Sequence, residues 1–185
     1  PYNAALGDGS EYRAVSGMTV EALRRWHRRR MRVLAEAAPD VIAVETLTSL
    51  VEIEAVAAEL GGLGIPAWIS VTVDHGVLRS GESLADAFAI ASSVGEVVAV
   101  GVNCCSAQDV AGALSAAREA TPLPLIAYPN SGEEWDGVTR SWTGASDLGE
   151  TEFTAWGTQA AALGGCCRVT PATISRIART LGAAA

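Results

Sequence analysis

Two pairs of adjacent cysteines carry the chemistry that this sequence could perform. Cys104 and Cys105 follow Gly-Val-Asn, Cys166 and Cys167 follow two glycines, and the chain has no other cysteine. Thiolates are soft ligands that favour zinc over magnesium or calcium. Three protein ligands with an open fourth position are typical of a catalytic zinc. The pattern therefore predicts a metal site that uses three of the four thiols.

A zinc ion held by three thiolates would be suited to thiol chemistry. The site would carry a net charge of about −1, which makes the ion a poor activator of water. Coordination deprotonates an incoming thiol outright, and the resulting thiolate is a nucleophile. The expected reaction class is therefore alkylation of a thiol.

Other interpretations of the cysteines stay open at this point. Free cysteines are common small hydrophobic residues of protein cores, and adjacent cysteines can form a strained disulfide. A closed site with all four thiols would be structural, whereas a redox protein would be expected to carry a CxxC motif, which is missing here. Adjacent residues of a strand point to opposite faces. We therefore expect Cys104 to face the site and Cys105 to pack toward a helix.

The elements that must position these thiols alternate along the chain. Apolar runs without strict alternation are typical of parallel strands covered by helices. The expected strands span 41–45, 67–73, 97–102, 125–128 and 161–163. The expected helices span 18–39, 50–60, 83–94, 107–120 and 151–162, and a last one begins at Thr170 with Pro171 in its first turn.

Polar residues follow each expected strand in turn. They are Glu45 and Thr46, Asp74 and His75, Asn103 and Cys104, Asn130 and Ser131, and Cys166 and Cys167. The loops after the strands of a (β/α)₈ barrel form one catalytic face, whereas a doubly wound sheet binds ligands at a single crevice. Five successive strand ends that carry such residues favour the barrel, so the predicted fold class is α/β, a (β/α)₈ TIM-type barrel. Neither a GxGxxG nor a GxxxxGK[ST] motif is present, so the sequence gives no sign of nucleotide binding.

The chain is expected to supply only part of that barrel. A barrel has eight strands and typically about 250 residues, and the Gly-rich opening at 1–13 resembles the tail of an earlier βα unit. We expect residues 1–185 to be a single domain, the C-terminal part of a longer protein. It would supply roughly the last five βα units, with the first three strands missing.

The composition of the chain indicates which classes of binding partner to expect. The net charge of −8 argues against nucleic acid. Six arginines between positions 24 and 32 are interpreted as the solvated face of an amphipathic helix, with Leu23, Trp26 or His27, Met31 and Leu34 on the other face. No apolar stretch is long enough to span a membrane, and no signal peptide is evident. The expected setting is the cytoplasm, and the oligomeric state stays open.

Several motifs together resemble a known family. They are GVNC (101–104), YPNSGE (128–133) and GGCCR (164–168), with the opening PYNAALGDGSEYR and the run VIAVET (41–46). In this combination and order the sequence resembles the homocysteine S-methyltransferases of the S-methylmethionine type. The resemblance implies a zinc-dependent (β/α)₈ barrel. Its reaction would transfer a methyl group from a sulfonium donor, S-methylmethionine or S-adenosylmethionine, to L-homocysteine and give methionine.

The resemblance also implies roles for individual residues. The zinc ligands fall on Cys104, Cys166 and Cys167, in agreement with the spacing argument. The substrate site falls on Glu45, Thr46, Asn103, Asn130 and Ser131, with Tyr128 in the same loop face. Glu45 would hold the amino group of homocysteine, a pairing that a carboxylate makes well, and Asn103 would order the site.

Alternatives remain within and outside this family. A related zinc enzyme could use S-adenosylmethionine, betaine or a folate as its methyl donor. A truncated, catalytically inactive relative would bind only zinc or a thiol. No general base is needed beyond the metal, and His75 is not assigned as a ligand.

Overall fold

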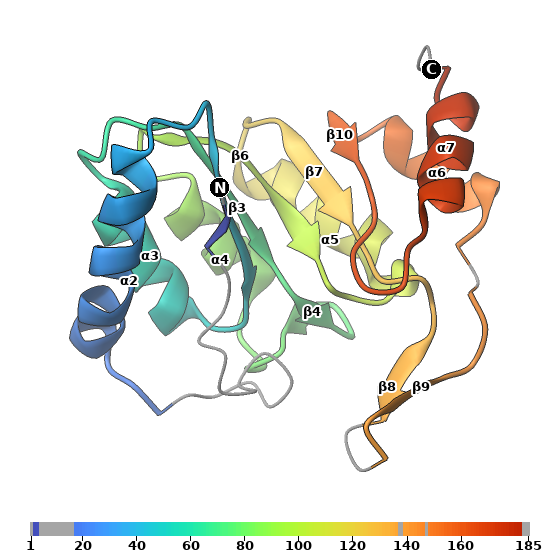
Figure 1. Cartoon of the computed structure of the whole chain (residues 1–185), viewed down its shortest axis with the longest axis horizontal. Helices are drawn as coiled ribbons and strands as arrows, with labels where there is room; N and C mark the ends of the chain where they lie inside the picture. Colours follow the sequence, from blue (N-terminus) through green and yellow to red (C-terminus); the bar gives the residue numbers. More distant parts are fainter. Residues whose placement is uncertain (1, 4–16, 137–138, 147, 183–185) are drawn as a thin grey trace.

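Six parallel strands form the main sheet, and they lie side by side in chain order (Figure 1). The computed structural model describes residues 2–3, 17–136, 139–146 and 148–182. The strands are β1 (Tyr2–Asn3), β2 (Ile42–Leu47), β3 (Ala67–Val71), β6 (Val97–Asn103), β7 (Leu125–Tyr128) and β10 (Ala162–Leu163). All five expected strands are present, and β1 is a sixth, within a segment that the sequence had suggested to be a loop.

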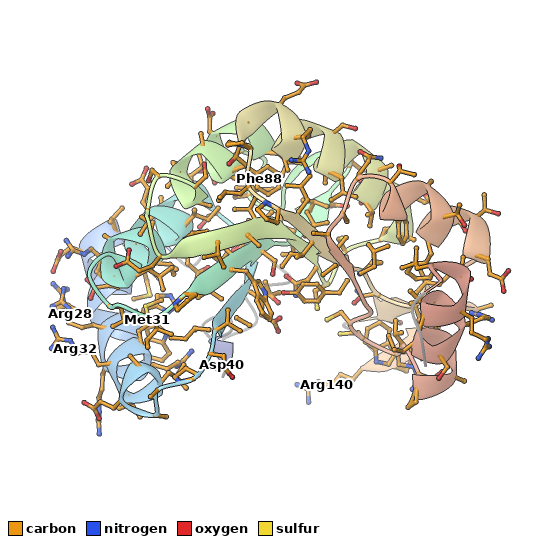
Figure 2. The ribbon with its side chains drawn as sticks, turned by 90° about the horizontal axis from the view of Figure 1, so that it is seen from above. Arg28, Met31, Arg32, Asp40, Phe88 and Arg140 are labelled. Carbon is orange, nitrogen blue, oxygen red and sulfur yellow. The ribbon has the colours of Figure 1, made fainter. Side chains whose placement is uncertain are left out.

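Helices cover one side of this sheet. They are α2 (Val20–Glu36), α3 (Leu50–Leu60), α4 (Leu84–Ala91), α5 (Ala107–Ala120), α6 (Glu150–Gly157) and α7 (Pro171–Thr180). Each packs against the next in the chain, and Figure 2 shows them along the outer side of a curved sheet. The structure is thus an α/β fold with a parallel sheet. Within its described residues, no helix is long and apolar enough to cross a membrane.

Side-chain hydroxyls fix where most of the helices begin. In five of the six helices within the described part of the chain, the residue before the helix accepts a hydrogen bond from a backbone N–H of the first turn. Such caps satisfy N–H groups that lack a partner inside the helix. The capping residues are Thr19, Ser49, Ser83, Ser106 and Thr170.

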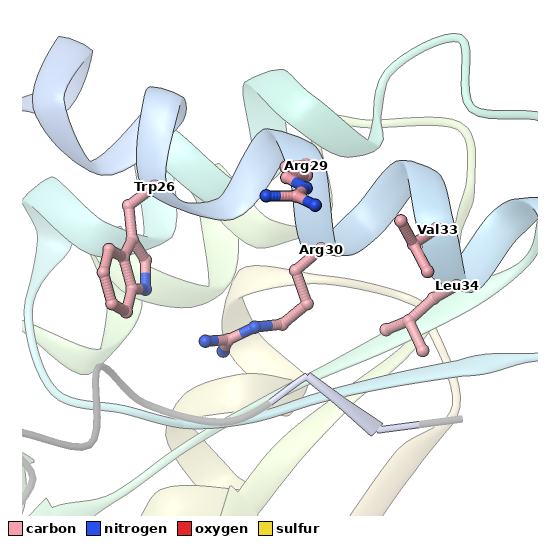
Figure 3. A pocket seen from close by; sticks show the side chains of 5 residues that line it. All are labelled: Trp26, Arg29, Arg30, Val33 and Leu34. Carbon is pink, nitrogen blue, oxygen red and sulfur yellow. The ribbon is translucent and has the colours of Figure 1, made fainter.

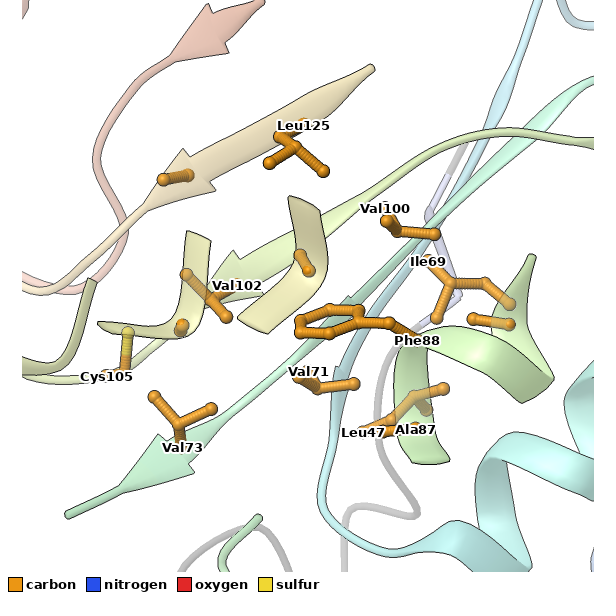
Figure 4. Packing of buried hydrophobic residues seen from close by; sticks show 14 of the residues in the cluster. Leu47, Ile69, Val71, Val73, Ala87, Phe88, Val100, Val102, Cys105 and Leu125 are labelled. Atoms are coloured by element: carbon orange, nitrogen blue, oxygen red, sulfur yellow. The ribbon is translucent and has the colours of Figure 1, made fainter. Parts of the chain in front are cut away.

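The core lies between the sheet and the helices. Phe88 of α4 is 1% exposed and is surrounded by strand residues, among them Ile69, Val71, Val100 and Val102 (Figure 4). These strand residues alternate with others that point to the opposite, concave face, because successive side chains of a strand alternate. The strand residues that do not pack in the core therefore lie on the concave face, where their side chains are available for a functional site.

Two short hairpins follow strands of the main sheet, and the sequence analysis missed both. One pairs β4 (Val73–Asp74) with β5 (Val77–Leu78), and the other pairs β8 (Glu134–Asp136) with β9 (Ser141–Thr143). The expected strand at 67–73 therefore ends at Val71. There the Thr72 N–H donates to the Leu47 carbonyl, and the chain turns into the first hairpin.

Helix α2 resolves the choice between Trp26 and His27. His27 is fully buried, with Nε2 3.1 Å from Oε1 of Glu52 on α3, whereas Trp26 is 46% exposed. The arginine run is also more than a solvated face. Arg24 and Arg28 both donate to the Glu59 carboxylate of α3, at 2.9 and 2.8 Å. These ion pairs help to fix α2 against α3.

Candidate metal and substrate site

Three of the four thiols converge beyond the ends of β6 and β10. Cys104 Sγ lies 2.8 Å from Cys166 Sγ and 3.7 Å from Cys167 Sγ, and the last two are 4.0 Å apart. Among the described residues, these three form the only group of Cys, His, Asp and Glu side chains that could hold a metal ion. All are half-buried and none is in a disulfide.

The thiol cluster fits a tetrahedral zinc ion. Zinc–sulfur bonds of about 2.3 Å at tetrahedral angles separate the sulfur atoms by about 3.8 Å. The two distances from Cys167 to the other sulfurs are close to this value, and the Cys104–Cys166 pair would have to open by about 1 Å. The donor set, three soft thiols, also suits zinc.

Hydrogen bonds between the thiols divide their acidities. The thiols of Cys104 and Cys166 hydrogen-bond to Cys167 and hold its pKa below the ordinary value. For Cys104, the hydrogen bonds with Cys166 and Cys167, together with burial, raise the pKa of the thiol. The contacts within the cluster thus stabilise negative charge on Cys167.

The backbone at Cys104 explains why adjacent cysteines differ. Cys104 has φ 52°, in the left-handed region that non-glycine residues rarely adopt. The Thr72 hydroxyl donates to the Cys104 carbonyl at 3.1 Å and supports this turn. Cys105 is fully buried in the core (Figure 4), and burial raises the pKa of its thiol to about 12. Cys104 thus lies in the thiol cluster, whereas Cys105 lies in the hydrophobic core.

The loop after β7 holds the backbone of the second cysteine pair. The N–H groups of Cys166 and Cys167 donate to the Pro129 carbonyl at 2.8 Å and to Asn130 Oδ1 at 3.1 Å. The Ser131 N–H in turn donates to the Cys167 carbonyl at 3.0 Å. Asn130 and Ser131 therefore lie at the site, in contact with the main chain that presents two thiols.

A β-bulge interrupts β2 just after Glu45, a residue that alternation with the buried Val44 already directs to the concave face. The register between β2 and β3 shifts between Val44 and Leu47, and Thr46 has φ 63°, which is unusual for a β-branched residue. Asn103 holds this strained turn through both ends of its amide. Its Oδ1 accepts from the Thr46 N–H at 2.9 Å, and its Nδ2 donates to Thr46 Oγ1 at 2.8 Å. Bulges of this kind commonly redirect side chains at functional sites.

The neighbours of Glu45 include residues that the sequence analysis missed. Tyr128 donates from its hydroxyl to Glu45 Oε2 at 2.9 Å, and that hydroxyl also contacts Ser70 and Trp68 of β3. The sequence placed Tyr128 only within the loop motif. Trp68 and Ser70 occupy alternate positions of AWISV, and this period-two parity could have assigned both to the concave face.

Glu45 carries no compensating cation among the residues that the structure describes. Burial raises the pKa of its carboxyl group, against the lowering effect of the Tyr128 hydrogen bond. Burial likewise raises the pKa of the Tyr128 phenol, which keeps it a donor at neutral pH. A half-buried carboxylate in this setting is suited to binding a cationic group.

A hollow of about 450 Å³ lies on the surface of α2, and its lining contains neither a thiol nor a carboxylate. It is lined by Trp26, Arg29, Arg30, Val33 and Leu34 (Figure 3). The Arg30 guanidinium lies 5.6 Å from the centre of the Trp26 ring, a distance at which a cation–π contact forms. None of these residues belongs to the thiol cluster.

Converging thiols beside a carboxylate, at the carboxyl ends of parallel strands, define a candidate metal- and thiol-binding site in an α/β protein. Comparison with known families is consistent with this class. The family model described as homocysteine S-methyltransferase matches residues 1–181. The chain belongs to the homocysteine S-methyltransferase family.

Individual relatives support the same assignment. Homocysteine S-methyltransferase 2 of Zea mays is 41% identical over 97% of this chain and 56% of its own length. Selenocysteine Se-methyltransferase of Brassica oleracea var. italica is 39% identical over 97% of the chain and 55% of its own length. The chain thus spans little more than half the length of these relatives.

A solved structure also matches the fold. The homocysteine methyltransferase MmuM from Escherichia coli, in its metallated form, is 36% identical with a TM-score of 0.77. The match covers 93% of this chain and 56% of that one. The arrangement of strands and helices described above therefore resembles the matching part of that structure.

Proposed function

We propose that this chain provides the metal- and homocysteine-binding part of a zinc-dependent homocysteine S-methyltransferase. The proposed reaction moves a methyl group from a sulfonium donor, S-methylmethionine or S-adenosylmethionine, to homocysteine and yields methionine. The observation that carries the proposal is the convergence of three thiols in the same site as a half-buried carboxylate. The alternative of an inactive metal-binding relative has no comparable observation in its favour.

Cys104, Cys166 and Cys167 would hold the zinc ion. Bound there, zinc would supply Lewis acidity that lowers the pKa of a thiol ligand and so generates a thiolate at neutral pH. The metallated form of MmuM supports a metal in this family. The loop of Asn130 and Ser131 would keep the two adjacent ligands in place through its hydrogen bonds to their main chain.

Glu45 would bind the α-ammonium group of homocysteine. Pairing with that cation would compensate the charge of a carboxylate that is partly desolvated. Asn103 and Thr46 would hold the carboxylate in position through the bulge. Fixing the amino acid end in this way places the sulfur near the thiol cluster, which lowers the entropic cost of in-line attack on the methyl carbon.

The methyl transfer itself needs little further from the protein. The homocysteine sulfur forms a bond to the methyl carbon while the bond from that carbon to the donor sulfonium breaks. The bonding electron pair returns to the donor sulfur, which leaves as a neutral thioether. The proton of the homocysteine thiol passes to solvent, so a separate general base is not required.

We infer further that the sheet is part of a (β/α)₈ barrel formed by a single domain. Parallel strands in unbroken chain order and helices along one side of a curved sheet support this inference. Free thiols at the site suit a reducing compartment, so we expect the enzyme to act in the cytoplasm on small molecules.

The test combines metal content with turnover. The proposal predicts about one zinc ion per chain by elemental analysis, with the sulfur of added homocysteine in its coordination shell by X-ray absorption. Cys104→Ser should lose the ion. Methyl transfer should be assayed with each sulfonium donor, and with betaine as a control donor. A protein that binds zinc but neither homocysteine nor a donor would refute the proposed activity.

A further inference from the structure

The Tyr128 hydroxyl connects three strands on the concave face. Tyr128 lies at the end of β7, and its hydroxyl donates to Glu45 Oε2 on β2 at 2.9 Å. The same oxygen accepts from the Trp68 indole N–H on β3 at 3.1 Å and contacts the Ser70 hydroxyl. A single polar atom from one strand thus reaches two strands beyond its immediate neighbour, β6.

The intervening strand is shaped for this crossing. The residue of β6 that pairs with both Ser70 and Ile126 is Gly101. A Cβ atom at Gly101 would overlap the Ile126 carbonyl oxygen, so a side chain cannot be accommodated without moving β7. Because Gly101 has no side chain, β6 leaves space for the Tyr128 side chain to pass over it and reach its partners on β3.

The hydrogen-bond partners also fix which way the phenol proton points. An indole N–H can only donate, so Trp68 occupies a lone pair of the Tyr128 oxygen. An ionised carboxylate can only accept, and Ser70 gives its own hydroxyl proton to Asn103 Oδ1, so the single phenol proton is shared between Glu45 Oε2 and Ser70 Oγ. The donor from Trp68 therefore turns the phenol proton toward Glu45 and the neighbouring Ser70 oxygen.

This contact engages only one of the two oxygens of Glu45. Tyr128 binds Oε2, and among the described residues no hydrogen bond from the protein reaches Oε1. Without the phenol, the carboxylate could rotate about its last torsion, which is broad and shallow. With the phenol in place, Oε1 is held in one direction and stays available to a ligand.

We propose that Tyr128, oriented by Trp68, is a positioning residue that aims Glu45 at the substrate amino group and so makes the site select amino thiols. The proposal rests on the proposed function, since it takes homocysteine as the ligand of Glu45. It adds the prediction that the phenol acts on recognition of the amino group and leaves the thiol end unaffected.

The experiment compares two ligands that differ only at the amino group. Binding of L-homocysteine and of 4-mercaptobutanoic acid, which lacks that group, is measured by calorimetry on the zinc-loaded protein. Tyr128→Phe removes one hydrogen bond to a charged acceptor. It should weaken homocysteine about tenfold and change 4-mercaptobutanoic acid by less than about twofold. Zinc content should be unchanged.

Further variants separate positioning from a general structural role. Glu45→Gln should reduce the preference for homocysteine, and adding Tyr128→Phe to it should have almost no further effect. Trp68→Phe retains an aromatic ring without the donor and should cause a smaller loss of the same selectivity. Ser93→Ala, which removes an exposed hydroxyl distant in the sequence from these strands, should change neither affinity.

Two results would overturn the inference. Equal weakening of both ligands by Tyr128→Phe would mean that the phenol only supports the fold, and unchanged affinity for both would mean that it does not position Glu45. If the unaltered protein failed to bind homocysteine, or bound it no better than 4-mercaptobutanoic acid, the proposed function would itself fail. The unaltered protein and the variant thus test the two ideas separately.

Discussion

Asn103 should be a major stabilising residue, because three hydrogen bonds end on its amide. Oδ1 accepts from the Thr46 N–H and from the Ser70 hydroxyl, each at 2.9 Å, and Nδ2 donates to Thr46 Oγ1 at 2.8 Å. At about 1 kcal/mol net for each bond, Asn103→Ala should lose about 3 kcal/mol. Relaxation of the strained Thr46 backbone would return about 1 kcal/mol. The expected loss in the free energy of unfolding is therefore about 2 kcal/mol.

Urea unfolding followed by tryptophan fluorescence measures this loss, with the m-value checked for constancy. Thr46→Val provides the matched background, since valine keeps the β-branched shape and its strain at positive φ but lacks the hydroxyl partner. In that background Asn103→Ala should cost about 1 kcal/mol less than in the unaltered chain, because one hydrogen bond is already absent. A loss below about 1 kcal/mol in the unaltered chain, or an equal cost in both backgrounds, would refute the reasoning.

Three further outcomes are expected. Cys166→Ser should abolish zinc binding by elemental analysis, whereas Cys105→Ala should retain it at some cost in stability; zinc retained by the first variant would contradict the assigned ligands. Glu45→Ala should raise the KM for homocysteine at least about tenfold without loss of zinc, and an unchanged KM would remove this residue from the site. Hydrogen bonds from Arg28 and Arg24 hold the pKa of Glu59 below its ordinary value. The resulting stabilisation is present above that ordinary pKa and is lost as the pH falls through the lowered one. The cost of Glu59→Gln in urea unfolding should therefore shrink toward zero at low pH, and a cost independent of pH would exclude the ion pairs as its cause.

The sequence was sufficient to predict the framework and the thiol cluster. Continuous apolar runs indicate buried parallel strands, and the carboxyl ends of such strands lie together whatever the details of packing. The positions of Cys104 and Cys166 directly after two such runs therefore assign both thiols to one edge of the sheet. Alternation of side chains indicated that only one of Cys104 and Cys105 would face the site, but the left-handed turn at Cys104, beyond the end of β6, decides which of them does.

The bulge in β2 and the contacts of Tyr128 could not be predicted in this way, because each depends on residues from different strands. The bulge at Thr46 exists because Asn103, from a strand two positions away in the sheet, replaces a ladder hydrogen bond. Trp68 and Ser70 contact the Tyr128 hydroxyl, which reaches them across β6, and Ser70 also donates to Asn103 of β6. Trp26 and His27 are adjacent on a helix, so periodicity left both eligible for burial. The buried Glu52 beside His27 shows which of them is inside.

The adjacent cysteines just after β6 differ in exposure, so their rates of alkylation report on two different events. Cys104 is half-buried at the site, and a bound metal ion would shield it from alkylating reagents. Cys105 is fully buried, with a pKa raised to about 12, so it can react only when the core opens. Timed alkylation, read by mass on the peptide that contains both, would therefore record metal release and opening of the core as two separate rates.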